Sequence, residues 1–227
     1  MRLRSLLFVP GDSERKFIRA KTSGAGALIL DLEDSVAPTQ KPVARNHVAK
    51  LLDDPSARDW AFFVRVNALD TGLALDDLAA VVKPGLDAIM IPKANGAEDL
   101  QLFGHYLDAF ETKAGIPLGS VKMAVVATET AKAMFALHTY APVHPRLLAL
   151  TWGAEDLSAA LGATDNKEPD GAWTFPYQVV RAQCLFAASA ADVMPIDTIH
   201  ADFRDLDGLE RDCRRSRRDG WLTAVCR

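Results

Sequence analysis

Two carboxylates lie where a parallel β/α protein would place its chemistry. Glu129 follows the apolar run 123–126, and Asp156 follows the apolar run 148–150. Short apolar runs bounded by turn residues are typical of buried parallel strands, whose carboxyl ends carry the active-site residues. Two converging acids without a basic partner repel each other or bind a cation, and Mg²⁺ takes one or two carboxylates. The alternative is that both acids face helix amino ends, with Asp156 as an N-cap.

A basic residue, Arg65, lies inside another apolar run, FVRVN. Because an unpaired buried charge is costly, this side chain must meet a carboxylate or a ligand. Its planar fork fits a substrate carboxylate, and the alternative is an ion pair with Glu33 or Asp34. Those two acids end a third apolar run, so one can orient the arginine while the other transfers protons. They also fit a solvated loop that begins before Pro38.

Lys93 follows Pro92 at the end of the run 89–91. Its ammonium could meet phosphate or enolate charge, and a salt bridge with Glu98 or Asp99 explains it equally well. The turn 10–13 precedes a helical segment, and its free backbone N–H groups can hold an anion. It lacks a glycine-rich fingerprint, so this signal is weak.

The elements that must position these residues alternate along the chain. Helical patterns separate the apolar runs, and seven such units favour a (β/α)₈ barrel over an open sheet of about five or six strands. Strands are predicted at 6–9, 27–32, 61–66, 88–91, 122–126, 147–152 and 194–197, and a short eighth near 220–225. Helices are predicted at 13–21, 41–53, 73–82, 97–114, 130–140, 176–190 and 205–218, and 162–175 is expected to be a long βα loop on the functional rim.

The composition is that of an ordinary globular domain. The chain has 227 residues, 49% hydrophobic and 25% charged, with a net charge of −4. This charge argues against a nucleic-acid partner, which usually requires a basic excess. The three cysteines form no metal or disulfide pattern, and no run could span a membrane or act as a signal peptide. A reducing cytoplasm is the simplest setting.

Several of these segments resemble one known family in the same order along the chain. The sequence is similar to citrate lyase β-subunit-like proteins of the HpcH/HpaI aldolase superfamily, which include malyl-CoA and citramalyl-CoA lyases. The resemblance extends to about Gly220. It rests on the segments RSLLFVPG, LDLEDSVAP, VRVN, IPK, TET, WGAEDL and DFRD.

The resemblance implies a TIM-type barrel that forms trimers or hexamers and uses Mg²⁺. By position, Glu129 and Asp156 match the metal carboxylates, and Arg65 matches the arginine that holds the substrate. Glu33 and Asp34 match the acid pair near the reacting centre. We also expect Glu129 and Lys93 to contact substrate, and Arg4 and Lys16 to approach the CoA or carrier-protein arm.

The implied reaction is cleavage of a 3-hydroxy-acid thioester into an acyl thioester and an oxo acid. The substrate would be of the citryl, malyl or citramalyl type, carried on CoA or a carrier protein. A malyl-CoA thioesterase and a non-catalytic barrel that binds Mg²⁺ and an oxo acid are the alternatives.

The resemblance ends before the C-terminus. Family members usually continue through an Ile-His-Pro turn into a closing helix and a lid, whereas this sequence ends with GWLTAVCR. We therefore expect residues 1–227 to form one barrel domain that is shortened at the eighth strand and lacks the closing helix and lid.

Overall fold

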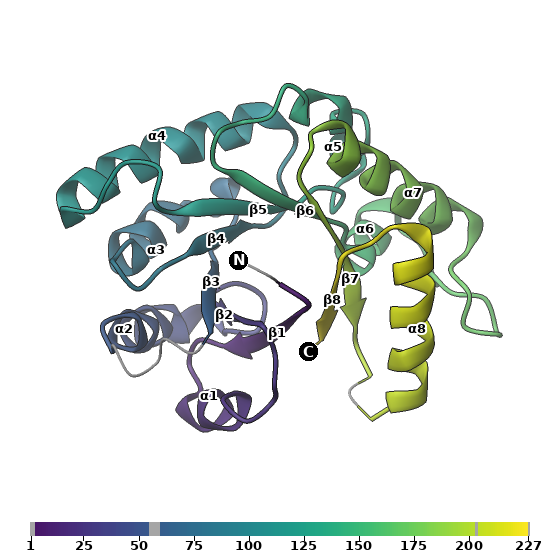
Figure 1. The fold of residues 1–227 in the computed structure, drawn as a ribbon, viewed down its shortest axis with the longest axis horizontal. Helices are drawn as coiled ribbons and strands as arrows, with labels where there is room; N and C mark the ends of the chain where they lie inside the picture. Colours follow the sequence, from purple (N-terminus) through teal and green to yellow (C-terminus); the bar gives the residue numbers. More distant parts are fainter. Residues whose placement is uncertain (1–2, 55–59, 203, 227) are drawn as a thin grey trace.

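The strands form a closed barrel in a computed structural model that describes residues 3–54, 60–202 and 204–226 (Figure 1). Each strand pairs in parallel with the next along the chain, and β8 also pairs with β1. The predicted (β/α)₈ barrel is confirmed. The strands are β1 (Ser5–Pro10), β2 (Ala27–Asp31), β3 (Ala61–Arg65), β4 (Ala88–Ile91), β5 (Lys122–Val126), β6 (Leu147–Thr151), β7 (Met194–His200) and β8 (Thr223–Cys226).

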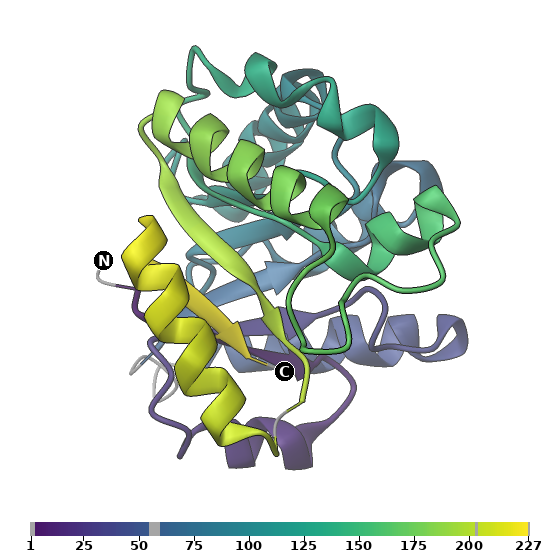
Figure 2. The ribbon, with the colours of Figure 1, turned by 90° about the vertical axis from the view of Figure 1, so that its right-hand side faces the viewer.

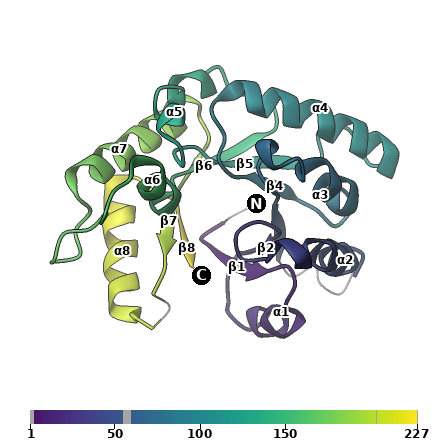
Figure 3. The same cartoon turned by 180° about the vertical axis from the view of Figure 1, so that it is seen from behind.

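Helices surround the barrel on its outer side, as the opposite views in Figures 1 and 3 show. The α-helices are α1 (Glu14–Ala20), α2 (Lys41–Leu52), α3 (Ala74–Val81), α4 (Ala97–Ala114), α5 (Ala131–Met134), α6 (Ala154–Leu161), α7 (Phe175–Ala190) and α8 (Leu206–Asp219). Short 3₁₀ turns include η1 (Pro38–Gln40), η3 (Leu69–Thr71) and η4 (Leu137–Tyr140). No helix of the described residues is long and apolar enough to cross a membrane.

The hydrophobic core has two layers because alternate strand residues face opposite sides. Ile29, Phe63 and Met90 belong to the cluster inside the barrel. Leu30 and Val64 belong to the larger cluster beneath the helices. Burial on both faces explains why the strands read as continuous apolar runs in the sequence.

The eighth strand is short but closes the barrel. Thr223 donates a hydrogen bond to the Leu3 carbonyl at 2.9 Å, and Val225 joins the interior cluster. Trp221 precedes β8 and is fully buried, with the Arg181 guanidinium 5.3 Å from its ring centre. Figure 2 shows α8 running alongside this part of the barrel.

Two predicted elements differ from the structure. The single helix expected at 130–140 is instead α5 and η4, because the backbone tightens to i→i−3 hydrogen bonds from the amides of Phe135, Ala136 and Thr139. The Thr139 hydroxyl accepts from the Ala97 amide and donates to the Ala136 carbonyl. The segment 162–175 does not directly connect a strand to a helix, since α6 intervenes between β6 and this segment. The segment joins α6 to α7 and contains one antiparallel bridge between Lys167 and Trp173.

Candidate active site

Charged side chains gather at the carboxyl ends of β2 to β6. Each is the last residue of a strand or follows a strand by a few residues, which brings distant segments together on one rim. This acid cluster contains the carboxylates Asp31, Glu33, Asp34, Glu129 and Asp156 and the cations Arg65 and Lys93.

Arg65 is held by a carboxylate that the sequence analysis did not single out. Its Nε and Nη2 atoms donate to the two oxygens of Asp31, both at 2.7 Å. Nη1 lies 3.0 Å from Glu33 Oε2 and 4.0 Å from Asp34 Oδ2, so the expected ion pair also exists. Asp31 and Arg65 occupy paired positions in β2 and β3, a register that could have revealed the contact.

Asp31 is a satisfied carboxylate. It is 1% exposed and also accepts hydrogen bonds from the backbone N–H groups of Glu33 and Ser35. Burial alone would raise its pKa, but the Arg65 hydrogen bond and charge, together with these amides, hold the pKa of Asp31 below its usual value. Asp31 therefore orients Arg65 and stays ionised.

Glu33 lies between the two cations. Its Oε1 accepts from Lys93 Nζ at 2.5 Å, and its Oε2 is buried in an ion pair with Arg65 that lacks hydrogen-bond geometry. Burial raises the pKa of Glu33, although Arg65 and Lys93 oppose this shift. A carboxyl with a raised pKa is suited to proton transfer.

Lys93 links three sides of the cluster. Its ammonium lies 3.4 Å from Asp34 Oδ2 and 3.3 Å from Asp156 Oδ1, besides its bond to Glu33. The alternative salt bridge with Glu98 or Asp99 is therefore wrong. Its backbone adopts a positive φ of 51°, which is unusual for a residue other than glycine.

Glu129 is a buried acid without a cationic side chain bonded to it among the described residues. It is 4% exposed, and among the described residues its one hydrogen bond comes from the Lys93 backbone N–H at 2.5 Å. Burial, with the nearby charges of Asp156 and Glu33, raises the pKa of Glu129 to about 8. A Cβ atom on Gly153 would lie 2.7 Å from Glu129 Cγ, so only glycine admits this close approach.

Asp156 lies in the first turn of α6 and is not its N-cap, which is Gly153. Glu155 shares this turn but is exposed. Asp156 thus faces the positive end of the α6 dipole, as the alternative interpretation expected, whereas Glu129 precedes Thr130, the N-cap of the four-residue α5. Of the two acids in the first turn of α6, only Asp156 also reaches Lys93.

The two residues expected near the CoA arm are far apart. Lys16 lies in the first turn of α1, beyond the carboxyl end of β1, and its amide bonds the Ser13 hydroxyl. Arg4 is exposed and precedes β1, so it lies at the opposite end of the barrel from the acid cluster. The structure brings Arg4 to neither Lys16 nor the carboxylates.

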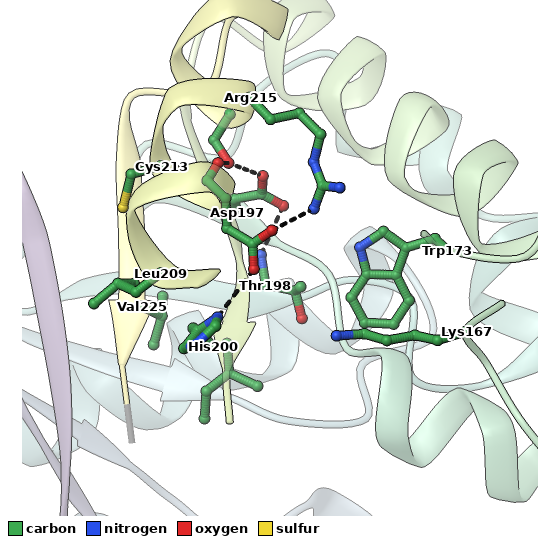
Figure 4. A pocket seen from close by; sticks show the side chains of 12 residues that line it. Lys167, Trp173, Asp197, Thr198, His200, Leu209, Cys213, Arg215 and Val225 are labelled. Atoms are coloured by element: carbon green, nitrogen blue, oxygen red, sulfur yellow. Dashed lines mark hydrogen bonds and ion pairs between the residues drawn. The ribbon is translucent and has the colours of Figure 1, made fainter. Parts of the chain in front are cut away.

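A second polar cluster lies between β7 and α8 beside a cavity of about 30 Å³ (Figure 4). Its charged groups pair with one another: Asp212 bonds both His200 and Arg215. Asp197 accepts from Trp152 Nε1 at 2.6 Å and from Arg181 Nη2 at 2.7 Å. Most of these charged groups are paired, although the buried Nε of Arg215 has no hydrogen-bond partner among the described residues, so we interpret the arrangement as a structural network.

Fold and site together define a class: a parallel β/α barrel with an acid-rich centre at the carboxyl ends of its strands. The family model described as HpcH/HpaI aldolase/citrate lyase matches residues 4–226. The chain belongs to this family.

Individual proteins are also similar to this chain in sequence and in structure. The chain is 33% identical to the citrate lyase subunit beta-like protein of Mycobacterium tuberculosis, over 97% of this chain and 72% of that protein. It is 34% identical to a (3S)-malyl-CoA thioesterase of Cereibacter sphaeroides, over 96% and 70%. The solved structure of Mycobacterium tuberculosis protein CitE with magnesium, acetoacetate and coenzyme A is 32% identical. It superimposes with a TM-score of 0.79, covering 99% of this chain and 76% of that one.

Proposed function

We propose that this chain is a Mg²⁺-dependent carbon–carbon lyase that cleaves a 3-hydroxyacyl thioester into an acyl thioester and an oxo acid. The observation that carries the proposal is Glu129: a buried carboxylate with one hydrogen bond, beside Asp156 on the functional rim. Family membership and the magnesium-bound relative support the same reaction class.

The donor chemistry fits Mg²⁺, which prefers carboxylate oxygens and keeps other positions for water and substrate. Glu129 and Asp156 would hold the ion, since the charge of Asp156 acts on Glu129 and Lys93 contacts both, Glu129 through its backbone N–H and Asp156 through its ammonium. No group of three potential ligands forms a metal site within residues 3–54, 60–202 and 204–226. When bound, the ion would supply Lewis acidity to the oxygens of the substrate.

Arg65 would orient the substrate. Of its five N–H donors, two bond Asp31 and one faces Glu33, which leaves two for a carboxylate or carbonyl oxygen. Because Asp31 fixes the guanidinium, little side-chain entropy is lost when the substrate binds.

The remaining residues would move the proton. One carboxylate of the Glu33–Asp34 pair takes the hydroxyl proton as the carbon–carbon bond breaks, and the resulting carboxylic acid then returns a proton to the enolate carbon of the acyl thioester. Lys93 lies against both carboxylates and places positive charge where the enolate forms. Lys16 lies on the same rim and would approach the thioester arm, whereas Arg4 lies at the other end of the barrel and would meet only a ligand or neighbour there.

The test is to incubate the protein and Mg²⁺ with citryl-, malyl- and citramalyl-CoA and to measure the released oxo acid. We expect Glu129→Gln and Asp156→Asn to abolish release, and Glu155→Gln to retain it. Glu155 is a matched control because it shares the first turn of α6 but lies outside the cluster. Equal loss in all three variants would support a helix-dipole role instead.

Thioester hydrolysis is the second candidate, because a malyl-CoA thioesterase is among the relatives. Hydrolysis releases free CoA together with the intact hydroxy acid, whereas the lyase reaction releases an acyl-CoA and an oxo acid. Substrate binding without either set of products would identify the non-catalytic alternative.

We also propose that the protein forms a homo-oligomer, a trimer or hexamer. Phe135 and Phe175 are 87% and 75% exposed, and large exposed apolar side chains often mark contact surfaces. Light scattering would test this, and a monomer at all concentrations would contradict it.

A further inference from the structure

Lys41 occupies a position that local energetics disfavour. It is the first residue of α2, where the helix dipole repels positive charge, and it is only 8% exposed. Burial lowers the pKa of its ammonium, although four nearby acids oppose this shift. A residue that breaks a local rule in this way calls for a compensating role.

Its contacts indicate that role. Lys41 Nζ donates to the Leu32 carbonyl at 2.7 Å and to the Glu33 carbonyl at 2.8 Å. These carbonyls belong to the turn that carries Glu33 and Asp34 beyond the end of β2. Lys41 therefore holds the backbone of the acid pair and contacts none of the reacting groups.

A second support meets the same carbonyl. Asn67 Nδ2 donates to the Leu32 carbonyl at 3.0 Å and to Asp77 at 2.7 Å. Asp77 is completely buried and also bonds Arg45 of α2 at 2.6 Å. The turn is thus fixed from α2 and from the residue Asn67 that follows β3. Among the described residues, Lys41 supplies the only ammonium that contacts the backbone carbonyls of the turn, whereas Lys93 contacts its side chains.

We propose that Lys41 is a positioning residue, which holds the 32–34 turn so that Glu33 meets both Arg65 and Lys93. The expected effect on catalysis rests on the lyase function proposed above. The role of Lys41 in holding the turn does not depend on that function. Loss of Lys41 should loosen the turn and spare Glu129 and Asp156, because these follow β5 and β6.

The test compares Lys41→Met and Lys41→Arg with Lys83→Met as the control. Lys83 also ties down α2, but at its far end, through Asp53 and the Ala49 carbonyl. Hydrogen exchange is measured at the amides of Glu33 and Val36, together with kcat, KM and Mg²⁺ affinity by calorimetry. Lys41→Gln replaces Lys41→Met if the latter does not fold.

In Lys41→Met we expect exchange at these amides to accelerate roughly 10-fold, the scale of one lost hydrogen bond. We expect kcat to fall roughly 100-fold, as for a displaced catalytic group, with little change in KM and Mg²⁺ affinity. Lys41→Arg should restore part of both effects, and Lys83→Met should show neither.

Unchanged exchange in the turn would overturn the proposal, as would uniformly faster exchange with loss of Mg²⁺ affinity. If the wild-type protein cleaves no thioester, the lyase proposal fails. The exchange result still decides the positioning role, because it requires no substrate.

Discussion

Two buried glutamates of this barrel have opposite environments. Glu111 on α4 is fully buried and accepts two hydrogen bonds from Arg146, at 2.8 and 2.6 Å. The backbone amides of Gly119 and Val121 donate two more, at 2.8 and 2.7 Å. Although burial alone would raise it, the pKa of Glu111 is lowered by these donors.

Glu129 is almost equally buried, but within the described part of the chain it has a single hydrogen bond and two acidic neighbours, Asp156 and Glu33. Its pKa is raised to about 8 by burial and these charges. Burial alone therefore does not show whether a carboxylate is structural or functional. What distinguishes a functional acid from a structural one is whether the fold satisfies it.

The largest expected effect concerns Glu111, the glutamate whose hydrogen bonds are satisfied. Arg146→Met should reduce the free energy of unfolding by about 3–5 kcal/mol, because it leaves Glu111 buried without its cation. Urea denaturation measures this change. A loss below about 1 kcal/mol, the scale of an exposed pair, would show that Glu111 is not structurally dependent on Arg146.

The two glutamates should respond to the same substitution with opposite sign. Glu111→Gln should destabilise the protein by about 2–3 kcal/mol because it breaks a charged hydrogen-bond network. Glu129→Gln should stabilise the metal-free protein at pH 8 by about 1–3 kcal/mol, since glutamine keeps an acceptor for Lys93 and removes the repulsion. Thermal melts in chelator test both. If both variants changed the stability of the protein in the same direction, the two glutamates would not differ as proposed.

A smaller effect should follow from crowding Glu129 without changing its chemistry. In Gly153→Ala the new methyl meets Glu129 Cγ, which must shift. We expect a stability loss of about 1–2 kcal/mol, the usual cost of overpacking, and a measurable weakening of Mg²⁺ binding. Unchanged Mg²⁺ affinity would mean that the Glu129 geometry does not matter to the ion.

The smallest effect is the pH dependence of Glu111. Because its folded pKa lies below the ordinary value of 4.5, its stabilisation is complete above that pH and is lost as the pH falls through the folded pKa. The stability difference between wild type and Glu111→Gln should therefore shrink in urea melts as the pH falls below 4.5. A constant difference would contradict the lowered pKa.

Much of the barrel could be predicted because buried parallel strands leave continuous apolar runs, and all the predicted strands exist within a few residues. The gathering of Glu33, Asp34, Arg65 and Lys93 was also predictable, since strand carboxyl ends share one rim. That the chain is one domain without a closing helix and lid stays a prediction.

Other features depend on contacts across the fold that periodicity does not encode. In the sequence, Asp31 is only the residue that follows an apolar run. Its bond to Arg65 could be predicted only if the register between β2 and β3 were known. The start of α6 at Ala154 moved Asp156 away from the N-cap. Residues 130–140 form α5 and η4 instead of one helix, and the contact of Thr139 in η4 with the first amide of α4 is one that no local pattern reveals.

The most direct test is calorimetric titration of Mg²⁺ into the wild-type protein, Glu129→Gln and Glu111→Gln, below the unfolding temperature of each. We expect wild type and Glu111→Gln to bind Mg²⁺ with similar affinity. In Glu129→Gln we expect the Mg²⁺ affinity to fall at least about 10-fold, the scale of a lost charged contact. Binding by Glu129→Gln that equals wild type would contradict the claim that the unsatisfied glutamate is the metal-binding acid.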